Sequence, residues 1–164
     1  MSKIDARAVQ GAVARRGLHV CVGIPAVLLV FGLILRSQFE FLAAPAASEE
    51  NLRIIGYVLI ALAICGLAIG FLIKRNRMAS LQLRQRIAAH PGEFVEAIVD
   101  AVMPIFIIAA VPAGYGLIFY FLGGDLDTYV LLSVCCPAGL MVFKPKEDEI
   151  ERLDRDIFGG EESV

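Results

Sequence analysis

One uncharged stretch constrains the fold of this chain more than any other feature. Between Arg53 and Lys74 the sequence contains no charged residue. A helix over 54–73 would be about 30 Å long at a rise of 1.5 Å per residue, which is the thickness of a bilayer's hydrocarbon core. A buried helix of a soluble protein can be equally apolar. Three similar stretches in one small chain, however, leave too little polar surface for a soluble fold. The sequence therefore predicts an integral membrane protein.

The other uncharged stretches cover 18–35, 101–124 and 128–143. The last is short for a bilayer, so we expect local thinning of the membrane or burial against its neighbours there. Backbone polar groups must be paired within a membrane, and each stretch is therefore expected to be a helix. A membrane β-barrel would need strands of alternating polarity, whereas these runs are apolar on all sides. We expect an all-α fold, a bundle of four transmembrane helices.

Composition agrees with this class and bounds the number of domains. Hydrophobic residues make up 58% of the 164 residues. Soluble domains contain only about 45–50% apolar residues. The length suits a single ordinary domain. We expect a transmembrane domain over 1–143 and a helical tail over 144–164.

The positive charges indicate the orientation. Lysines and arginines gather before the first span, between the second and third, and after the fourth, while the two outer loops contain only Arg36 and Arg53. Cytoplasmic loops carry such an excess of Lys and Arg. We therefore expect a multi-pass protein of the inner (cytoplasmic) membrane, with both termini and the loop 74–100 in the cytoplasm.

The first span has an alternative interpretation. A basic N-terminus, an apolar stretch and the Ala-Pro-Ala sequence at 44–46 resemble a signal peptide with its cleavage site. The apolar stretch is longer than the usual run of about 7–15 residues, and the candidate site lies well beyond its end. We expect the first span to be retained.

Short amphipathic helices are predicted outside the spans. The segment 1–16 is expected to form an interfacial helix with cations that meet anionic headgroups. In the loop 74–100, one helix is expected to stop at His90-Pro91-Gly92, and a second then continues into span three through a kink at Pro104. On this second helix, Glu93, Glu96 and Asp100 share one face.

The tail has the sharpest local helix pattern. Pro145 suits a first turn, acids follow it, and Asp148/Arg152 and Glu151/Arg155 are i,i+4 pairs. Its apolar stripe is too narrow for anchoring in lipid, and its acids would be repelled by anionic headgroups. We expect it to dock on protein, either the chain's own basic loop 74–86 or a partner subunit, through Ile150, Leu153, Ile157 and Phe158.

Adjacent cysteines at positions 135 and 136 lie in the middle of span four. Neighbouring helix residues point about 100° apart, so Cys135 and Cys136 cannot form a disulfide without distortion. An apolar surrounding disfavours the thiolate that nucleophiles and metal ligands require. We expect both to pack as small hydrophobes. Other small residues stand at GxxxG or similar spacings. The predicted helix-packing residues are therefore Gly66, Gly70, Ala109, Ala113, Cys135, Cys136 and Gly139.

Two polar sites have competing interpretations. His19 is placed to relay protons near the inner membrane face, but a simple hydrogen bond at the interface is favoured. Glu93, Glu96 and Asp100 form a candidate cation mouth, although a solvated face that pairs with Arg84 and Arg86 is favoured. No ionisable residue lies deep inside a span. Pumps and proton-coupled transporters usually need one.

These observations favour a non-catalytic structural or assembly subunit of a larger inner-membrane complex, such as secretion, respiratory or transport machinery. The rival is a small homo-oligomeric channel or transporter with the acidic mouth. A membrane enzyme acting on lipid or quinone has only His19 and the interfacial acids to offer. The expected partners are the bilayer, other membrane subunits and a second copy of the chain. No cofactor, metal or nucleic acid is expected.

Overall fold

The computed structural model describes residues 5–38 and 47–159. In chain order its elements are α1 (Ala6–Leu18), the π-helix η1 (His19–Gly23), α2 (Ile24–Gln38), α3 (Glu49–Met78), α4 (Leu81–Ala89), the 3-10 helix η3 (Pro91–Glu93), α5 (Phe94–Phe121), α6 (Leu126–Phe143) and α7 (Glu147–Phe158). The candidate cleavage site at 44–46 and the last residues of the tail lie outside the described residues.

Within the described residues, four helices are long and apolar enough to cross a membrane. They are Ala6–Gln38, Glu49–Met78, Pro91–Phe121 and Leu126–Phe143. Each of the four predicted spans coincides with one of them, and no strand occurs in the described part of the chain. The all-α prediction is confirmed.

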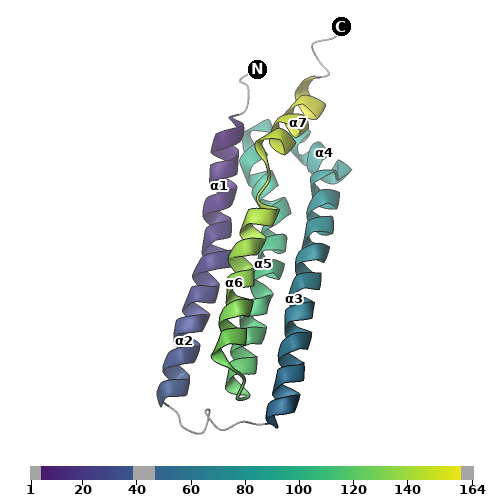
Figure 1. The fold of residues 1–164 in the computed structure, drawn as a ribbon. Helices are drawn as coiled ribbons and strands as arrows, with labels where there is room; N and C mark the ends of the chain where they lie inside the picture. The colour runs from purple at the N-terminus through teal and green to yellow at the C-terminus, as the bar shows by residue number, and fades with distance from the viewer. Residues whose placement is uncertain (1–4, 39–46, 160–164) are drawn as a thin grey trace.

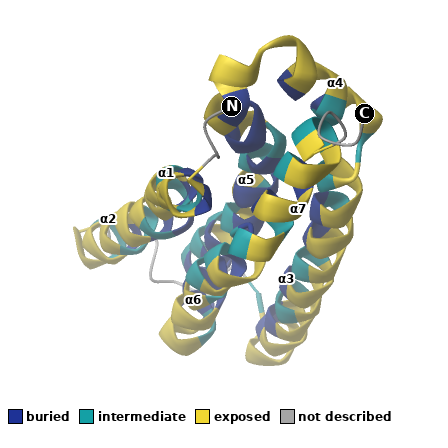
Figure 2. Ribbon diagram, turned by 90° about the horizontal axis from the view of Figure 1, so that it is seen from above, coloured by how far each residue is buried: buried dark blue, intermediate teal, exposed yellow. Residues whose placement is uncertain are grey.

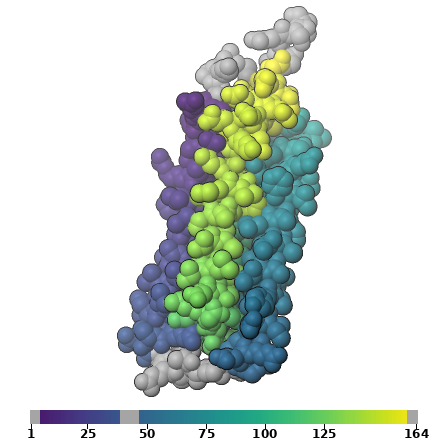
Figure 3. Space-filling model, viewed as in Figure 1, coloured from purple at the N-terminus to yellow at the C-terminus, as the bar shows by residue number. Residues whose placement is uncertain are grey.

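The hairpin of α5 and α6 forms the centre of the bundle. The helix pair α1–α2 packs on one side of this hairpin and α3 on the other (Figures 1 and 2). Figure 3 shows α6 exposed along its length between these two flanks. Because α5 lies against every other long helix, it supplies most of the large buried side chains of the core.

Both described ends of the chain, α4 and α7 lie at one end of the bundle, which we call the terminal end (Figure 1). The opposite end holds the end of α2, the start of α3 and the α5–α6 turn. This turn is tight, with Gly123 at φ 99°, a conformation that side chains with a Cβ rarely adopt. Asp125 then caps α6 by accepting the backbone N–H of Thr128.

The N-terminal segment differs from the expected interfacial helix. α1 continues through η1 into α2 as one long helix, and Val9 and Val13 are buried in the core of the terminal end. The π turn precedes Pro25, which lacks an N–H and whose ring would clash with the carbonyl of Cys21 in a regular helix. The wider turn, closed by the N–H of Ile24 on the carbonyl of His19, accommodates this ring.

The predicted kink site at Pro104 lies inside a continuous helix. α5 runs through both Pro104 and Pro112. It begins directly after η3, at the point where the sequence predicts a restart after His90-Pro91-Gly92. Its first turns present Phe94, Ile98 and Val102 to the core.

Candidate functional site

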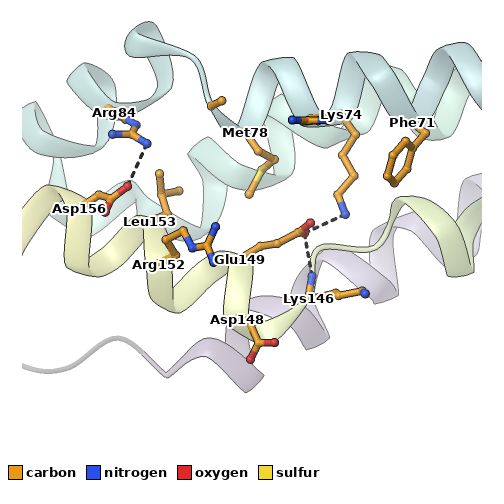
Figure 4. Close-up of a pocket in the computed structure, with 12 residues that line it drawn as sticks. Phe71, Lys74, Met78, Arg84, Lys146, Asp148, Glu149, Arg152, Leu153 and Asp156 are labelled. Carbon is orange, nitrogen blue, oxygen red and sulfur yellow. Dashed lines mark hydrogen bonds and ion pairs between the residues drawn. The ribbon is translucent and has the colours of Figure 1, made fainter.

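A hollow of about 570 Å³ opens at the terminal end between α3, α4 and α7 (Figure 4). Charged side chains dominate its wall, with a few apolar ones between them. The lining residues are Phe71, Lys74, Arg75, Met78, Ala79, Arg84, Lys146, Asp148, Glu149, Arg152, Leu153 and Asp156. We call this feature the basic hollow, because its cations outnumber its acids.

Lys74 is the most unusual residue of the basic hollow. It follows the apolar part of α3, yet its side chain is only 4% exposed. Its Nζ lies 2.8 Å from Oε2 of Glu149 and donates a hydrogen bond of 3.3 Å to the backbone carbonyl of Lys144. A buried ammonium is tolerated only when paired and hydrogen-bonded. Both conditions are met here by residues near or within α7.

Glu149 has two roles at the start of α7. Its carboxylate accepts the backbone N–H of Lys146 at 3.0 Å, which satisfies one of the free donors at a helix N-terminus. The same oxygen, Oε2, pairs with Lys74. The residue that begins the tail helix is therefore also the one that ties it to α3.

Further contacts attach α7 to other helices of the bundle. Glu147 lies 3.6 Å from Arg7 of α1, and Asp156 lies 3.0 Å from Arg84 of α4. The carbonyl of Pro145, just before α7, accepts a hydrogen bond from Gln10. The tail helix is thus in contact with three elements that precede it in the chain.

The predicted docking stripe faces the chain's own core. Ile150 and Leu153 are almost completely buried in one apolar cluster with side chains of α1, α4 and α5, while Ile157 and Phe158 pack against that cluster half-buried. Of the two docking surfaces considered from the sequence, the structure thus shows the internal one in use. A partner-docking role for these four residues stays a prediction.

The expected i,i+4 pairs within the tail are not seen. Arg155 instead donates to the backbone carbonyl of Glu151, and no ion pair joins Asp148 to Arg152 among the described residues. The acids that do form pairs reach across to other helices. Pairs within one helix gain only about 0.2–0.5 kcal/mol, so tertiary partners override them easily.

Of the three acids of the candidate cation mouth, only Asp100 forms an ion pair among the described residues. Asp100 pairs with Arg86 of α4 at 3.0 Å, which is one of the two arginines named in the alternative interpretation. Arg84 pairs with α7 instead. Glu93 and Glu96 are exposed. Within the described residues, no group of three or more His, Cys, Asp or Glu side chains is placed to hold a metal ion.

His19 interacts with its own helix. Its Nδ1 lies 2.7 Å from the carbonyl oxygen of Arg15, one turn earlier, and the ring is exposed. This is the hydrogen-bonded arrangement favoured above. Of the adjacent cysteines, Cys136 is fully buried with its thiol near the carbonyls of Leu132 and Ala110, and Cys135 is half-buried.

The predicted helix-packing residues divide into two groups. Ala109, Ala113, Gly139 and Gly70 are buried where helices meet, and a Cβ on Gly139 would lie 2.7 Å from that of Ala109. Gly66 differs, since a Cβ there would meet nothing within 4 Å. Of the two glycines of the GxxxG motif, Gly70 thus packs inside the bundle, whereas Gly66 faces open space.

From the sequence, Lys74 and Arg36 were interpreted only as positive charges that indicate the orientation in the membrane. Arg36, at the opposite end, donates from Nη1 to the carbonyls of Tyr120 and Gly124 at 3.0 and 2.9 Å and stacks on the ring of Tyr120. Both cations bind carbonyl groups near the ends of helices. Both residues stand directly beside an apolar run in the sequence, and this position is the signal that could have identified them.

Comparisons of the chain with protein-family models, with curated proteins and with solved structures found no match. The functional argument therefore depends on the geometry alone.

Proposed function

We propose that this chain is a four-span protein of the inner membrane, with both termini in the cytoplasm, and that it serves as a non-catalytic structural subunit of a larger membrane complex. The terminal end would then face the cytoplasm, in agreement with the excess of lysines and arginines there. Both described ends lie at the same end of the bundle, as an even number of crossings requires.

The open outer face of α3 carries the proposal. α3 packs on α5 and α6 along one side only, and away from this contact it presents Ile55, Leu62 and Ile69, which are exposed. Gly66 lies on the same side of α3, about one turn from Leu62 and from Ile69, with open space in the direction of its missing Cβ. Association of helices in membranes depends on close approach at small residues. This face is therefore suited to a neighbouring helix of another subunit.

The rival, a channel or transporter with an acidic mouth, has less support. Of Glu93, Glu96 and Asp100, the last is furthest along α5, and its charge is neutralised by Arg86. In the middle of the bundle, Ala109, Ala113, Leu132 and Cys136 are closely packed between α5 and α6. A subunit that contributes structure needs no path through its interior, and this packing suits that role.

Purification of the tagged chain in mild detergent tests the proposal. We expect one membrane protein to co-purify at a fixed stoichiometry with the wild-type chain and with Leu62→Ile, which conserves the side-chain volume on the side of α3 that carries Gly66. Gly66→Leu should release that protein, because it fills the open space without touching the chain's own core. A pure wild-type chain that conducts ions or solute, and loses this flux in Asp100→Asn, would instead establish the rival.

A further inference from the structure

The basic hollow has an uncompensated positive charge. Five of its lining residues are cations and three are acids. Lys74 is paired with Glu149, and Arg84 with Asp156. Arg75, Lys146 and Arg152 have no carboxylate within 4 Å among the described residues, and the remaining acid in the wall is Asp148. Three unpaired cations against one unpaired acid leave a surplus of two positive charges.

Unsatisfied hydrogen-bond donors accompany this charge. The Nε of Arg84 is buried and has no hydrogen-bond partner within the described part of the chain. The exposed guanidinium groups of Arg75 and Arg152 add donors from two different helices. A guanidinium group matches the geometry of phosphate oxygens and can bind two of them at once. The hollow therefore presents donors suited to an oxyanion such as phosphate.

The hollow lies where the apolar surface of α3 ends. Phe71, in its wall, is 48% exposed, and the neighbouring Leu72 is also exposed. Arg75 is one turn further along the same helix and also lines the hollow. Met78 and Leu153 add apolar wall next to the charged groups. A ligand that fits has an anionic head and an apolar portion that continues along α3 toward Phe71.

We infer that the basic hollow binds the phosphate headgroup of an anionic phospholipid, with an acyl chain lying along α3 beside Phe71 and Leu72. Basic pockets between membrane helices on the cytoplasmic side recognise such headgroups. The inference rests on the membrane location proposed above. A soluble phosphate compound shares the head chemistry but gains nothing from the exposed apolar side chains, so the lipid is favoured.

Binding of single lipids to the purified chain in neutral detergent tests this inference. The probes are dioleoyl phosphatidylglycerol, dioleoyl phosphatidylcholine and inorganic phosphate, measured by native mass spectrometry and by thermal unfolding. Arg75→Gln/Arg152→Gln removes two unpaired cations of the hollow. Arg77→Gln/Arg155→Gln is the matched control, because it makes the same charge change on the same two helices outside the hollow.

We expect phosphatidylglycerol to bind the wild-type chain and raise its unfolding temperature, and phosphatidylcholine to do so far less. A hydrogen bond to a charged group contributes about 1.5–3 kcal/mol, so Arg75→Gln/Arg152→Gln should weaken binding about tenfold or more. The control should change it less than about twofold. Arg75→Lys/Arg152→Lys should restore part of the affinity, because it keeps the charge but not the paired donors of the guanidinium group.

A second variant gives an effect of opposite sign. Asp148→Asn removes the unpaired acid of the wall and should tighten phosphatidylglycerol binding, whereas Glu151→Gln, on the same helix but outside the hollow, should not.

Equal losses in the hollow and control double variants would overturn the inference in favour of general surface charge. Equal stabilisation by inorganic phosphate would assign the hollow to a soluble ligand. Insertion is assayed separately by membrane extraction, so a failure of the membrane proposal would be recognised on its own.

Discussion

Nζ of Lys74 lies 2.8 Å from Oε2 of Glu149, and this ion pair joins the end of the second long helix to the start of the tail helix. The two residues come from distant parts of the sequence. Because the lysine is buried and the glutamate also caps α7, the pair couples folding of the tail to its attachment. α7 is therefore an integral part of the bundle in this structure.

The first prediction concerns this ion pair. Glu149→Gln removes the counter-charge of the buried ammonium and leaves it with neutral acceptors such as the carbonyl of Lys144. Since Glu149 is itself partly exposed, we expect destabilisation of about 1–3 kcal/mol, below the range for a fully buried pair. Lys74→Met should cost less, because it removes the buried charge and keeps an apolar stem. Thermal unfolding in detergent measures both effects.

The double variant Lys74→Met/Glu149→Gln provides the control for this prediction. It should be more stable than Glu149→Gln alone, because no unpaired ammonium remains. If the two single changes were simply additive, the ion pair would not be what couples α3 to α7.

The second prediction concerns the apolar attachment of α7. Leu153→Asp places a carboxylate in the apolar cluster of the terminal end and should release the helix, with a cost of at least about 2–5 kcal/mol, the range for removal of a buried leucine side chain. Membrane extraction should be unchanged, since the four long helices are intact. Amide hydrogen exchange should become fast across 147–158 and stay slow in α5.

Arg155→Asp is the matched control, because it introduces the same residue on the exposed side of α7. Its amide protection should remain close to that of the wild-type chain. Retained protection in Leu153→Asp would contradict the internal docking of the tail.

The third prediction separates the two kinds of glycine. Gly139→Ala puts a methyl group 2.7 Å from Cβ of Ala109, so α5 and α6 must move apart, at a cost of about 1–3 kcal/mol. Gly66→Ala meets nothing within 4 Å and should be neutral or stabilising by up to about 1 kcal/mol through helix propensity. Unfolding of the two variants in the same detergent gives the comparison. Equal effects would mean that the α5–α6 contact is not as close as described.

The long helices were predictable because their cause is local. A bilayer-length apolar run between charged residues forces internal pairing of the backbone, whatever lies beside it. The 54–73 run thus lies inside the helix Glu49–Met78. The α5–α6 turn was predictable for the same reason, since Gly123 and Asp125 are local turn and cap residues.

The candidate site was less predictable because its contacts are long-range. The burial of Lys74 depends on where α7 folds back, and nothing near Lys74 in the sequence indicates that. The helix pattern of the tail was read correctly, but its acids pair with Arg7, Lys74 and Arg84 on other helices. The continuity of α1 with α2 was also missed, although Pro25 is a local signal of altered helix geometry.

Labelling of introduced cysteines in intact cells tests the central claim most directly. In a background without the four native cysteines, Ser48→Cys and Gln85→Cys place exposed thiols at opposite ends of the bundle. A membrane-impermeant maleimide should label Ser48→Cys from outside, and Gln85→Cys only after the membrane is opened. The reverse pattern would contradict the orientation, and labelling of both thiols from the same side would contradict a bundle that crosses the membrane.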